Sequence, residues 1–444
     1  MQEGGNLPAT NLSEVAATSP VPVASRDNRK SNKFANDNDL PLSEATAPPP
    51  ISQDPTQRHL WDPSGYPLPE EAEKTPSGPI GPTEEKPPSA RLSKTATNLF
   101  SISYLIFFAI FGTLARIGLQ ALTFYPGAPV ITGVLWANVG GSLLMGFFLE
   151  DRNIFREEWG HSCTQDEDRD EHERVKNHKS VKKTIPLYIG LTTGFCGCFT
   201  SFSTFMRDVF FALSNDLPDP SGPTVHRNGG YSFMALVAVI LVTVSLSLSS
   251  LVFGAHLALC LHEYTPTIPF RLTRKFLDPI FTILGCGCWL GAVFMAIWPP
   301  DRFNTHETWR GRAIFSVVFA PLGCLLRFYL SLYLNTRFPT FPLGTFVSNM
   351  FGTVILAMCF DLQHVSWIGG TSAVSCQVLE GVMDGFCGST TTVSTWVAEL
   401  NGLGKRRSAY IYGVFSIGVA LGLLVVVMGS FRWTVGFGGT ACAS

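Results

Sequence analysis

The chain has 444 residues, of which 46% are hydrophobic and 15% charged, and its formal net charge is −2. In soluble globular proteins about a quarter of the residues are charged, so this composition argues against a soluble protein. No nucleotide-binding loop or catalytic triad occurs in the sequence. We therefore expect neither an enzyme nor a protein that binds nucleic acid.

Residues 1–97 are rich in Pro, Ser, Thr, Asn and charged residues. Such a segment buries too little apolar surface to offset the entropy that ordering would cost. We expect a disordered cytoplasmic tail. It is not a signal peptide, because the first apolar stretch begins only near residue 99.

Nine later stretches are apolar over the roughly 20 residues that a helix needs to cross a bilayer. The sequence thus predicts an all-α membrane protein with nine transmembrane helices. They span approximately residues 99–122, 129–149, 185–212, 232–260, 277–298, 313–334, 342–360, 372–398 and 409–430.

The loops indicate how these helices are oriented. The loop at about 150–183 contains eight Lys and Arg residues, and basic loops usually lie in the cytoplasm. This places the N-terminus inside and the C-terminus outside. The expected external loop after the fifth span fits less well, because it holds Arg302, Arg310 and Arg312.

The sequence contains an internal repeat. Each half has a Gly four residues before an Arg, and an Asn 22 residues after that Arg: Gly112, Arg116 and Asn138, then Gly323, Arg327 and Asn349. The third span repeats as well, with Gly194–Phe205 matching Gly385–Trp396. Chance does not produce such agreement, and the repeat indicates a duplication.

Four spans return a chain to the side from which it started, so the fifth span turns the second half over. We therefore expect two inverted four-helix repeats joined by one linker helix, with the transported species near the midplane. The expected domains are the tail (1–97), the first repeat (98–262), the linker (263–311), the second repeat (312–433) and a short external tail (434–444).

Asn138 and Asn349 lie in the middle of apolar spans, where an amide needs a partner. Each has Gly nearby, and the pair is duplicated, so we interpret the amide N–H groups as donors to a small anion. Hydrogen bonding between helices is the alternative.

The third spans combine Gly with hydroxyl residues, a composition at which a membrane helix can unwind. If both unwind at the midplane, their carbonyl groups converge on one point, and such oxygen ligands suit Na⁺. An intact, closely packed helix is the alternative. The hydroxyls that we expect near the pathway are Ser203, Thr204, Ser394 and Thr395.

Phe202 and Phe205 follow in the same segment, and Val393 and Trp396 take their places in the second repeat. The positive edges of aromatic rings can accompany an anion that has lost water. Ordinary packing against lipid or helices is the alternative for any single ring.

Arg116 and Arg327 are costly inside a membrane, and we expect them to reach toward a vestibule, where they would attract anions. Pairing with carbonyls at helix ends is an equal alternative. In the fourth span of the second repeat, Tyr412 and Ser416 are one helical turn apart, and we expect them to extend the track of hydrogen-bond donors along the pathway. The first repeat offers Ser245 with Ser249, or Thr243 with Ser247. The scattered Cys residues predict no disulfide and no metal–thiolate site.

These motifs resemble those of the Fluc/CrcB fluoride channels, whose four-helix subunits form antiparallel dimers. Two repeats fused through one extra helix resemble the eukaryotic members, called FEX. The resemblance covers about residues 99–430 and rests on Gly-x-x-x-Arg, the Asn with Gly, and the third-span Gly-x-Phe-Thr-Ser-Phe-Ser-Thr-Phe pattern.

The resemblance implies a passive, fluoride-selective pore lined by Asn138, Asn349, Phe202 and Phe205, with fourth-span hydroxyls. It also implies a central Na⁺ held by backbone carbonyls at Gly197, Thr200, Gly388 and Thr391. Val393 and Trp396 depart from the family pattern. If each pore takes one ring from each repeat, Phe202 pairs with Trp396 and Phe205 with Val393, so we expect unequal pores.

Such a channel would export cytoplasmic fluoride and give fluoride resistance, as a monomer in the lipid of the plasma membrane. One rival is an ion-coupled small-molecule transporter of inverted-repeat design, which the lack of a midplane carboxylate disfavours. The other is a scaffold that recruits partners through its tail, which has no use for paired intramembrane Asn and Arg.

Overall fold

The apolar stretches form helices, as they must where no water can satisfy the backbone. The computed structural model describes residues 94–128, 130, 132–156, 181–218, 227–298, 309–338, 340–365 and 373–438, and every regular element in these ranges is a helix. Of the expected N-terminal tail, residues 1–93 lie outside the described residues, and the first helix begins at Lys94. The last residues of the expected external tail, 439–444, also lie outside them.

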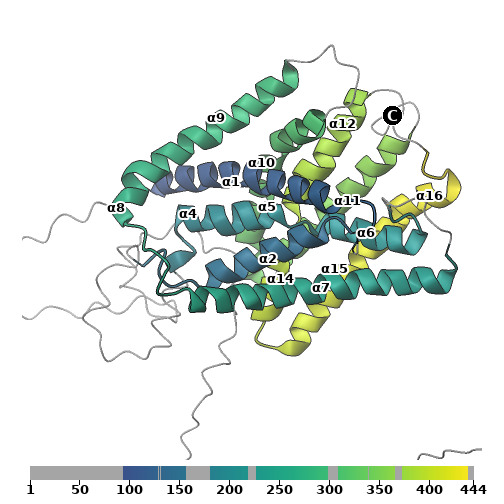
Figure 1. The fold of residues 1–444 in the computed structure, drawn as a ribbon, viewed down its shortest axis with the longest axis horizontal. Coiled ribbons are helices and arrows are strands. Elements are labelled where there is room, and N and C mark those ends of the chain that lie inside the picture. The colour runs from purple at the N-terminus through teal and green to yellow at the C-terminus, as the bar shows by residue number, and fades with distance from the viewer. Residues whose placement is uncertain are drawn as a thin grey trace, which may run out of the picture. The chain divides into compact units, whose positions relative to one another are not determined.

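The first repeat contains five helical stretches (Figure 1). They are α1 (Lys94–Thr123), α2 (Leu135–Glu150), the run α4 (Pro186–Ile189), η4 (Gly190–Cys196) and α5 (Gly197–Phe199), then α6 (Phe202–Ser214) and α7 (Gly229–Cys260). The linker consists of α8 (Phe270–Leu272), η5 (Thr273–Leu277) and α9 (Asp278–Ile297).

The second repeat follows the same order. Its elements are α10 (Trp309–Leu334), η6 (Asn335–Arg337), α11 (Leu343–His364), α12 (Ala373–Gly381), η7 (Val382–Cys387), α13 (Gly388–Thr390), α14 (Ser394–Gly402), α15 (Arg406–Leu424), η8 (Val425–Gly429) and α16 (Ser430–Thr434). The π-helical segments η4 and η7 occupy the same place in the two repeats, directly before α5 and α13.

Six helical stretches within the described residues are long and apolar enough to cross a membrane. They are Thr95–Thr123, Gly229–Cys260, Thr273–Ile297, Arg312–Arg337, Leu343–His364 and Arg406–Thr434. The chain is therefore a multi-pass membrane protein. The other three expected spans are the 16-residue helix α2 and the two third spans, which are interrupted.

The two repeats pack against each other through their broken third helices and their first helices. α1 lies against α10, α5 against α13, and α6 against α11 and α15. In turn α14 lies against α2 and α7. The second half of each third span therefore packs mainly on the second and fourth helices of the opposite repeat.

Helices α2 and α7 approach each other at two glycines. A Cβ placed on Gly146 would lie 1.9 Å from the Leu251 carbonyl oxygen, and one on Gly254 would lie 1.9 Å from that of Leu143. No side chain fits in such a space, so the two backbones are in direct contact. In α15, by contrast, a Cβ on Gly418 or Gly422 would meet no atom within 4 Å.

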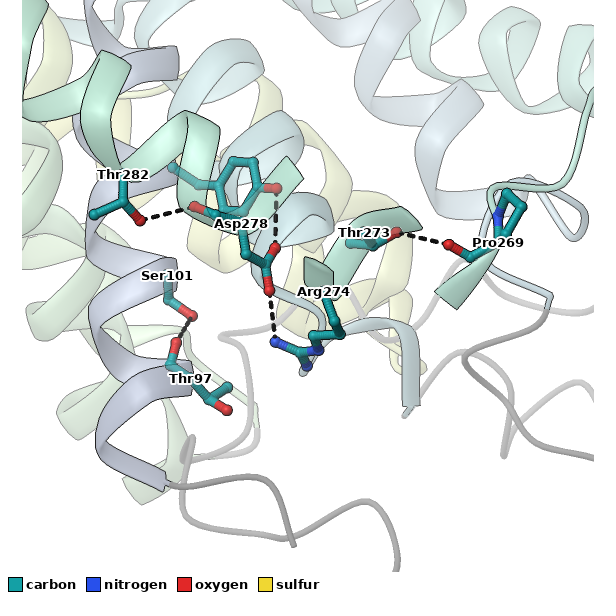
Figure 2. A network of polar contacts seen from close by, with 8 residues as sticks. Thr97, Ser101, Pro269, Thr273, Arg274, Asp278 and Thr282 are labelled. Atoms are coloured by element: carbon teal, nitrogen blue, oxygen red, sulfur yellow. Dashed lines mark hydrogen bonds and ion pairs between the residues drawn. The ribbon is translucent and has the colours of Figure 1, made fainter. Parts of the chain in front are cut away.

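The linker helix is fixed to the first repeat by a buried carboxylate. Asp278, at the start of α9, accepts hydrogen bonds from the Tyr104 hydroxyl of α1 and from Arg274, each at 3.0 Å. Figure 2 shows Arg274 and Thr282 flanking Asp278, with Thr282 bonded to its carbonyl oxygen at 2.8 Å. Because charged groups inside a membrane need partners, this network determines where α9 attaches.

The expectation that the chain has no disulfide is wrong for Cys376, which is disulfide-bonded. Disulfide formation depends on the distance between two sulfurs in space, and the spacing of cysteines along the sequence does not give that distance. The other described cysteines have free thiols.

Candidate functional site

Both third spans are interrupted where glycines and hydroxyl residues meet, as predicted. α5 ends at Phe199, Thr200 is extended (φ −95°, ψ 152°), and α6 begins at Phe202. The second repeat has the same geometry at Thr391 (φ −97°, ψ 152°), between α13 and α14. Each interruption exposes backbone groups that need partners inside the protein.

The two interruptions supply those partners to each other. The Ser203 N–H donates to the Thr391 hydroxyl at 3.0 Å, and the Ser394 N–H donates to the Thr200 hydroxyl at 3.1 Å. Likewise the Ser203 hydroxyl donates to the Cys387 carbonyl, and the Ser394 hydroxyl to the Cys196 carbonyl. This reciprocity shows that the two repeats meet at their interruptions through equivalent residues.

The two asparagines maintain the interruptions. The Asn138 Oδ1 accepts from the Ser201 N–H at 2.9 Å. In a continuous helix that N–H would bond to the Gly197 carbonyl four residues earlier, so the asparagine releases this carbonyl. In the second repeat the Asn349 Oδ1 accepts from the Thr392 N–H, also at 2.9 Å, and so releases the Gly388 carbonyl.

The carbonyls of Thr200 and Thr391 are released in a related way. The Thr204 N–H, which would bond to Thr200 in a helix, donates to the Ser201 hydroxyl at 3.2 Å. In the second repeat the Thr395 N–H donates to the Thr392 hydroxyl at 3.4 Å. All four carbonyls expected to bind Na⁺ have therefore lost their helical donors. Such oxygens suit a hard cation.

The amide nitrogens of the asparagines remain as donors. The Asn138 Nδ2 is buried and has no hydrogen-bond partner in the described part of the chain, and the Asn349 Nδ2 makes one bond of 3.3 Å to the Thr392 carbonyl. A buried donor without an acceptor destabilises a protein by about 1–3 kcal/mol. An anion beside either amide would remove such a cost.

The four side chains at the expected ring positions, of which Val393 has no ring, lie in one buried cluster. The Phe202 ring centroid is 5.4 Å from that of Trp396 and 5.8 Å from that of Phe205, and both contacts are edge-to-face. Trp396 also reaches α15, where its Cζ2 is 4.0 Å from a Cβ placed on Gly413. The structure thus brings Phe202 and Trp396 together, beside the fourth helix of the second repeat.

That fourth helix carries the expected hydroxyl track. Tyr412 and Ser416 are buried, and the Ser416 hydroxyl donates to the Tyr412 carbonyl at 2.7 Å. In the first repeat Thr243 and Ser247 are buried, whereas Ser245 and Ser249 are exposed. Of the two registers, Thr243 with Ser247 is the one whose side chains are buried.

Glu399 is a buried carboxylate that the sequence interpretation missed. It is 1% exposed and accepts hydrogen bonds from Thr345 (2.6 Å), Asn335 (3.2 Å) and Tyr412 (2.8 Å). It lies one residue beyond the eighth expected span, 372–398, so hydropathy gives no sign that it is buried. The sequence repeat does point to this residue. The 191-residue offset between the third spans pairs Glu399 with another acidic residue, Asp208, which is also buried.

The expected vestibule position is wrong for both arginines. Arg116 and Arg327 are 0% and 2% exposed. Arg327 donates to the carbonyls of Ser389 and Thr193, each at 2.8 Å, and Arg116 donates to the carbonyl of Asp384. Both guanidinium groups thus bond to backbone carbonyls, as in the alternative interpretation, although the Nε and Nη1 of Arg116 have no hydrogen-bond partner in the described part of the chain.

Each arginine is accompanied by a pair of side chains drawn from both repeats. Beside Arg116 the hydroxyls of Thr113 and Ser389 are 3.0 Å apart. The equivalent positions beside Arg327 are Cys324 and Cys198, whose sulfurs lie 3.8 and 3.4 Å from its Nη2. The two arginine sites are equivalent in position and differ in the chemistry of this pair.

Comparisons with known proteins agree with this duplicated arrangement. The family described as CrcB-like protein, Camphor Resistance (CrcB), matches residues 103–255 and 314–430. Fluoride export protein 1 of Neurospora crassa is 54% identical over 374 residues, which are 80% of this chain and 70% of that protein. Fluoride export protein 1 of Candida albicans is 36% identical over 367 residues, or 80% and 85% of the two chains.

A bacterial relative matches a shorter region. The fluoride-specific ion channel FluC of Pseudomonas syringae pv. maculicola is 33% identical over 111 residues, which are 25% of this chain and 84% of that protein. No match was found among solved structures.

Proposed function

The chain belongs to the CrcB-like family, and on that premise we propose that it is a passive, selective fluoride channel that exports the ion from the cytoplasm. Curated relatives matching most of its length are named fluoride export proteins. The observation that carries the proposal is the pair of buried asparagines. Each holds a helix interruption open with its oxygen and directs a neutral N–H₂ group into the buried interior.

Neutral donors suit a channel for a small anion. They compensate for the lost hydration of fluoride without binding it as tightly as a full positive charge, so the ion can leave again. From acidified surroundings, fluoride enters the cell as neutral HF. The HF dissociates in the cytoplasm, and the fluoride ion is trapped there. An inside-negative membrane potential drives each fluoride anion outward with about 2.3 kcal/mol per 100 mV, so a passive pore is sufficient.

The two sides of the molecule are unequal, and we assign conduction to one of them. The second-repeat side comprises Asn349, Phe202, Trp396, Tyr412 and Ser416. The first-repeat side comprises Asn138, Phe205, Val393, Thr243 and Ser247. The first-repeat side lacks one ring, and its helices α2 and α7 are in backbone contact at two glycines. The second-repeat side has both rings, which touch each other, and Trp396 also reaches α15.

Sodium fits the released carbonyls of Gly197, Thr200, Gly388 and Thr391. Bound there, it would neutralise their partial negative charge and link the two repeats. The guanidinium groups of Arg327 and Arg116 lie against Gly197 and Gly388, so they add positive charge at the same interface.

The membrane arrangement proposed with this function has nine helices in two inverted repeats, with α9 as the linker. Equivalent residues meet at the two interruptions, as expected for repeats related by a pseudo-two-fold axis in the membrane plane. The N-terminus would lie in the cytoplasm and the C-terminus outside the plasma membrane. One chain supplies both repeats, so it would act as a monomer.

Liposomes that contain the purified protein test the proposal. A fluoride electrode should record rapid, potential-driven efflux of fluoride, and a chloride electrode should record no efflux of chloride. Asn349→Ala should abolish the fluoride efflux. Empty liposomes are the control, and Asn138→Ala measures how much efflux is lost when the other interruption loses its asparagine. Vesicles with the wild-type protein that leak fluoride no faster than empty ones would refute the proposal. Transport that requires a Na⁺ or proton gradient would instead indicate the ion-coupled transporter.

A further inference from the structure

The indole of Trp396 carries a donor that its surroundings in the protein leave unused. The side chain is 1% exposed, and its Nε1 has no hydrogen-bond partner in the described part of the chain. Buried indole N–H groups usually find a partner. Trp289, in the linker helix, shows the usual situation, since its Nε1 donates to the Val318 carbonyl at 2.9 Å.

The unused N–H lies on the edge of the indole that faces α15. Cζ2 and Nε1 are both bonded to the same ring carbon, Cε2, so they share an edge. The Cζ2 atom is 4.0 Å from a Cβ placed on Gly413, the residue after Tyr412. The Phe202 ring meets the indole edge-to-face on the same second-repeat side, at 5.4 Å with an interplanar angle of 66°.

Polar side chains on the same helices form their hydrogen bonds with partners other than this N–H. Both carboxylate oxygens of Glu399 accept bonds, from Thr345 and Asn335 on one oxygen and from Tyr412 on the other. The Ser416 hydroxyl donates to the Tyr412 carbonyl. Because this N–H has no acceptor in the described part of the chain, a species that enters this space from outside the protein can accept it.

We infer that the indole N–H of Trp396 donates a hydrogen bond to the fluoride ion as it passes the aromatic pair, and that Trp396 thereby determines selectivity on the second-repeat side. The inference rests on the proposed channel function. Fluoride has the highest charge density of the halides and gains most from a true N–H donor. A ring C–H edge offers only a weak partial charge.

The repeat supplies an internal comparison. The equivalent of Trp396 in the first repeat is Phe205, at the 191-residue offset, and its side chain has no donor. The indole N–H therefore distinguishes the two sides chemically, and only the second-repeat side combines a ring edge with an N–H donor at this level.

Trp396→Phe tests the inference, because it keeps a ring and removes the N–H. Fluoride efflux from liposomes is measured over a range of fluoride concentrations. The half-saturating concentration should rise by about tenfold, the effect of one hydrogen bond to a charged group, and the preference for fluoride over chloride should fall. Trp289→Phe, which removes a paired indole N–H far from the aromatic pair, should match the wild type. Wild-type kinetics and selectivity in Trp396→Phe would overturn the inference.

A second variant covers the case in which the smaller ring prevents folding. Replacement of Trp396 by 3-benzothienylalanine through an amber codon keeps the bicyclic shape and exchanges the N–H for sulfur. It should give the same tenfold rise, and unchanged kinetics would overturn the inference. In either test, wild-type liposomes without fluoride flux would refute the channel proposal itself, whereas wild-type flux with an unaffected variant would refute only the role of Trp396.

Discussion

The second-repeat side and the first-repeat side occupy equivalent places in one duplicated framework, yet they differ in packing and in hydrogen bonding. On the second-repeat side, two rings touch, and a buried carboxylate organises the hydroxyls at one end. On the first-repeat side, Val393 replaces one ring, and α2 contacts α7 through glycine. A fused chain permits this divergence, because each repeat is encoded separately, whereas two identical subunits must change together.

The difference also shows what the shared framework requires. Both sides keep the asparagine bond to the interruption at 2.9 Å and the reciprocal bonds between interruptions. The asparagine bonds hold each interruption open, and the reciprocal bonds join the two repeats, so both are needed even where ions do not pass. Residues that serve conduction alone are free to change on one side.

The largest expected effect is the difference in fluoride efflux between variants that remove a ring from one side or from the other. Phe202→Ile should lower fluoride efflux at least roughly tenfold, because it removes the ring that contacts Trp396. Phe205→Ile should change efflux by less than about twofold, because we assign conduction to the other side. Both are measured with a fluoride electrode on liposomes of matched protein content. Equal losses of fluoride efflux in the two variants would refute the assignment of conduction to one side.

The glycine contact offers a test through stability. Gly146→Ala or Gly254→Ala forces a methyl group into the space between α2 and α7, and should lower the free energy of unfolding by about 1–3 kcal/mol or more. Gly418→Ala and Gly422→Ala, where the added carbon meets no atom within 4 Å, should be neutral or stabilising. Thermal unfolding in detergent compares the four variants. A stable Gly146→Ala protein would show that the two helices are not in contact.

The buried carboxylates sharpen the comparison further. Glu399→Gln turns an acceptor of three bonds into a group with one acceptor oxygen, and should cost about 1–3 kcal/mol of stability and slow fluoride efflux. Its repeat equivalent Asp208 lies 3.9 Å from Arg207 across a weak ion pair, so Asp208→Asn should have little effect on efflux. The reverse order of effects in the liposome assay would contradict the assignment of sides.

The smallest effect concerns the two arginine sites. The double variant Cys198→Ser with Cys324→Thr converts the thiol pair beside Arg327 into the hydroxyl pair found beside Arg116. Because the volumes are similar, the change in unfolding free energy should stay below about 1.5 kcal/mol, with efflux unchanged. Loss of efflux in this variant would assign the thiols a role that the Arg116 site does not have.

The sequence alone determined the features that depend on nearby residues. Apolar stretches predicted the helices, the repeat predicted two equivalent halves, and glycines beside hydroxyls predicted the interruptions at Thr200 and Thr391. Each of these signals is local, because hydropathy and helix breaking act over a few residues along the chain.

The tertiary structure decided every feature that depends on which distant residues meet. It buried Arg116 and Arg327 against carbonyls of the other elements, joined Glu399 to three donors, and buried Thr243 with Ser247 rather than the neighbouring register. It also brought α2 onto α7, although their glycines are about 100 residues apart in the sequence. The energy of a buried polar group depends on its partners in space, and neither residue type nor spacing along the chain specifies those partners.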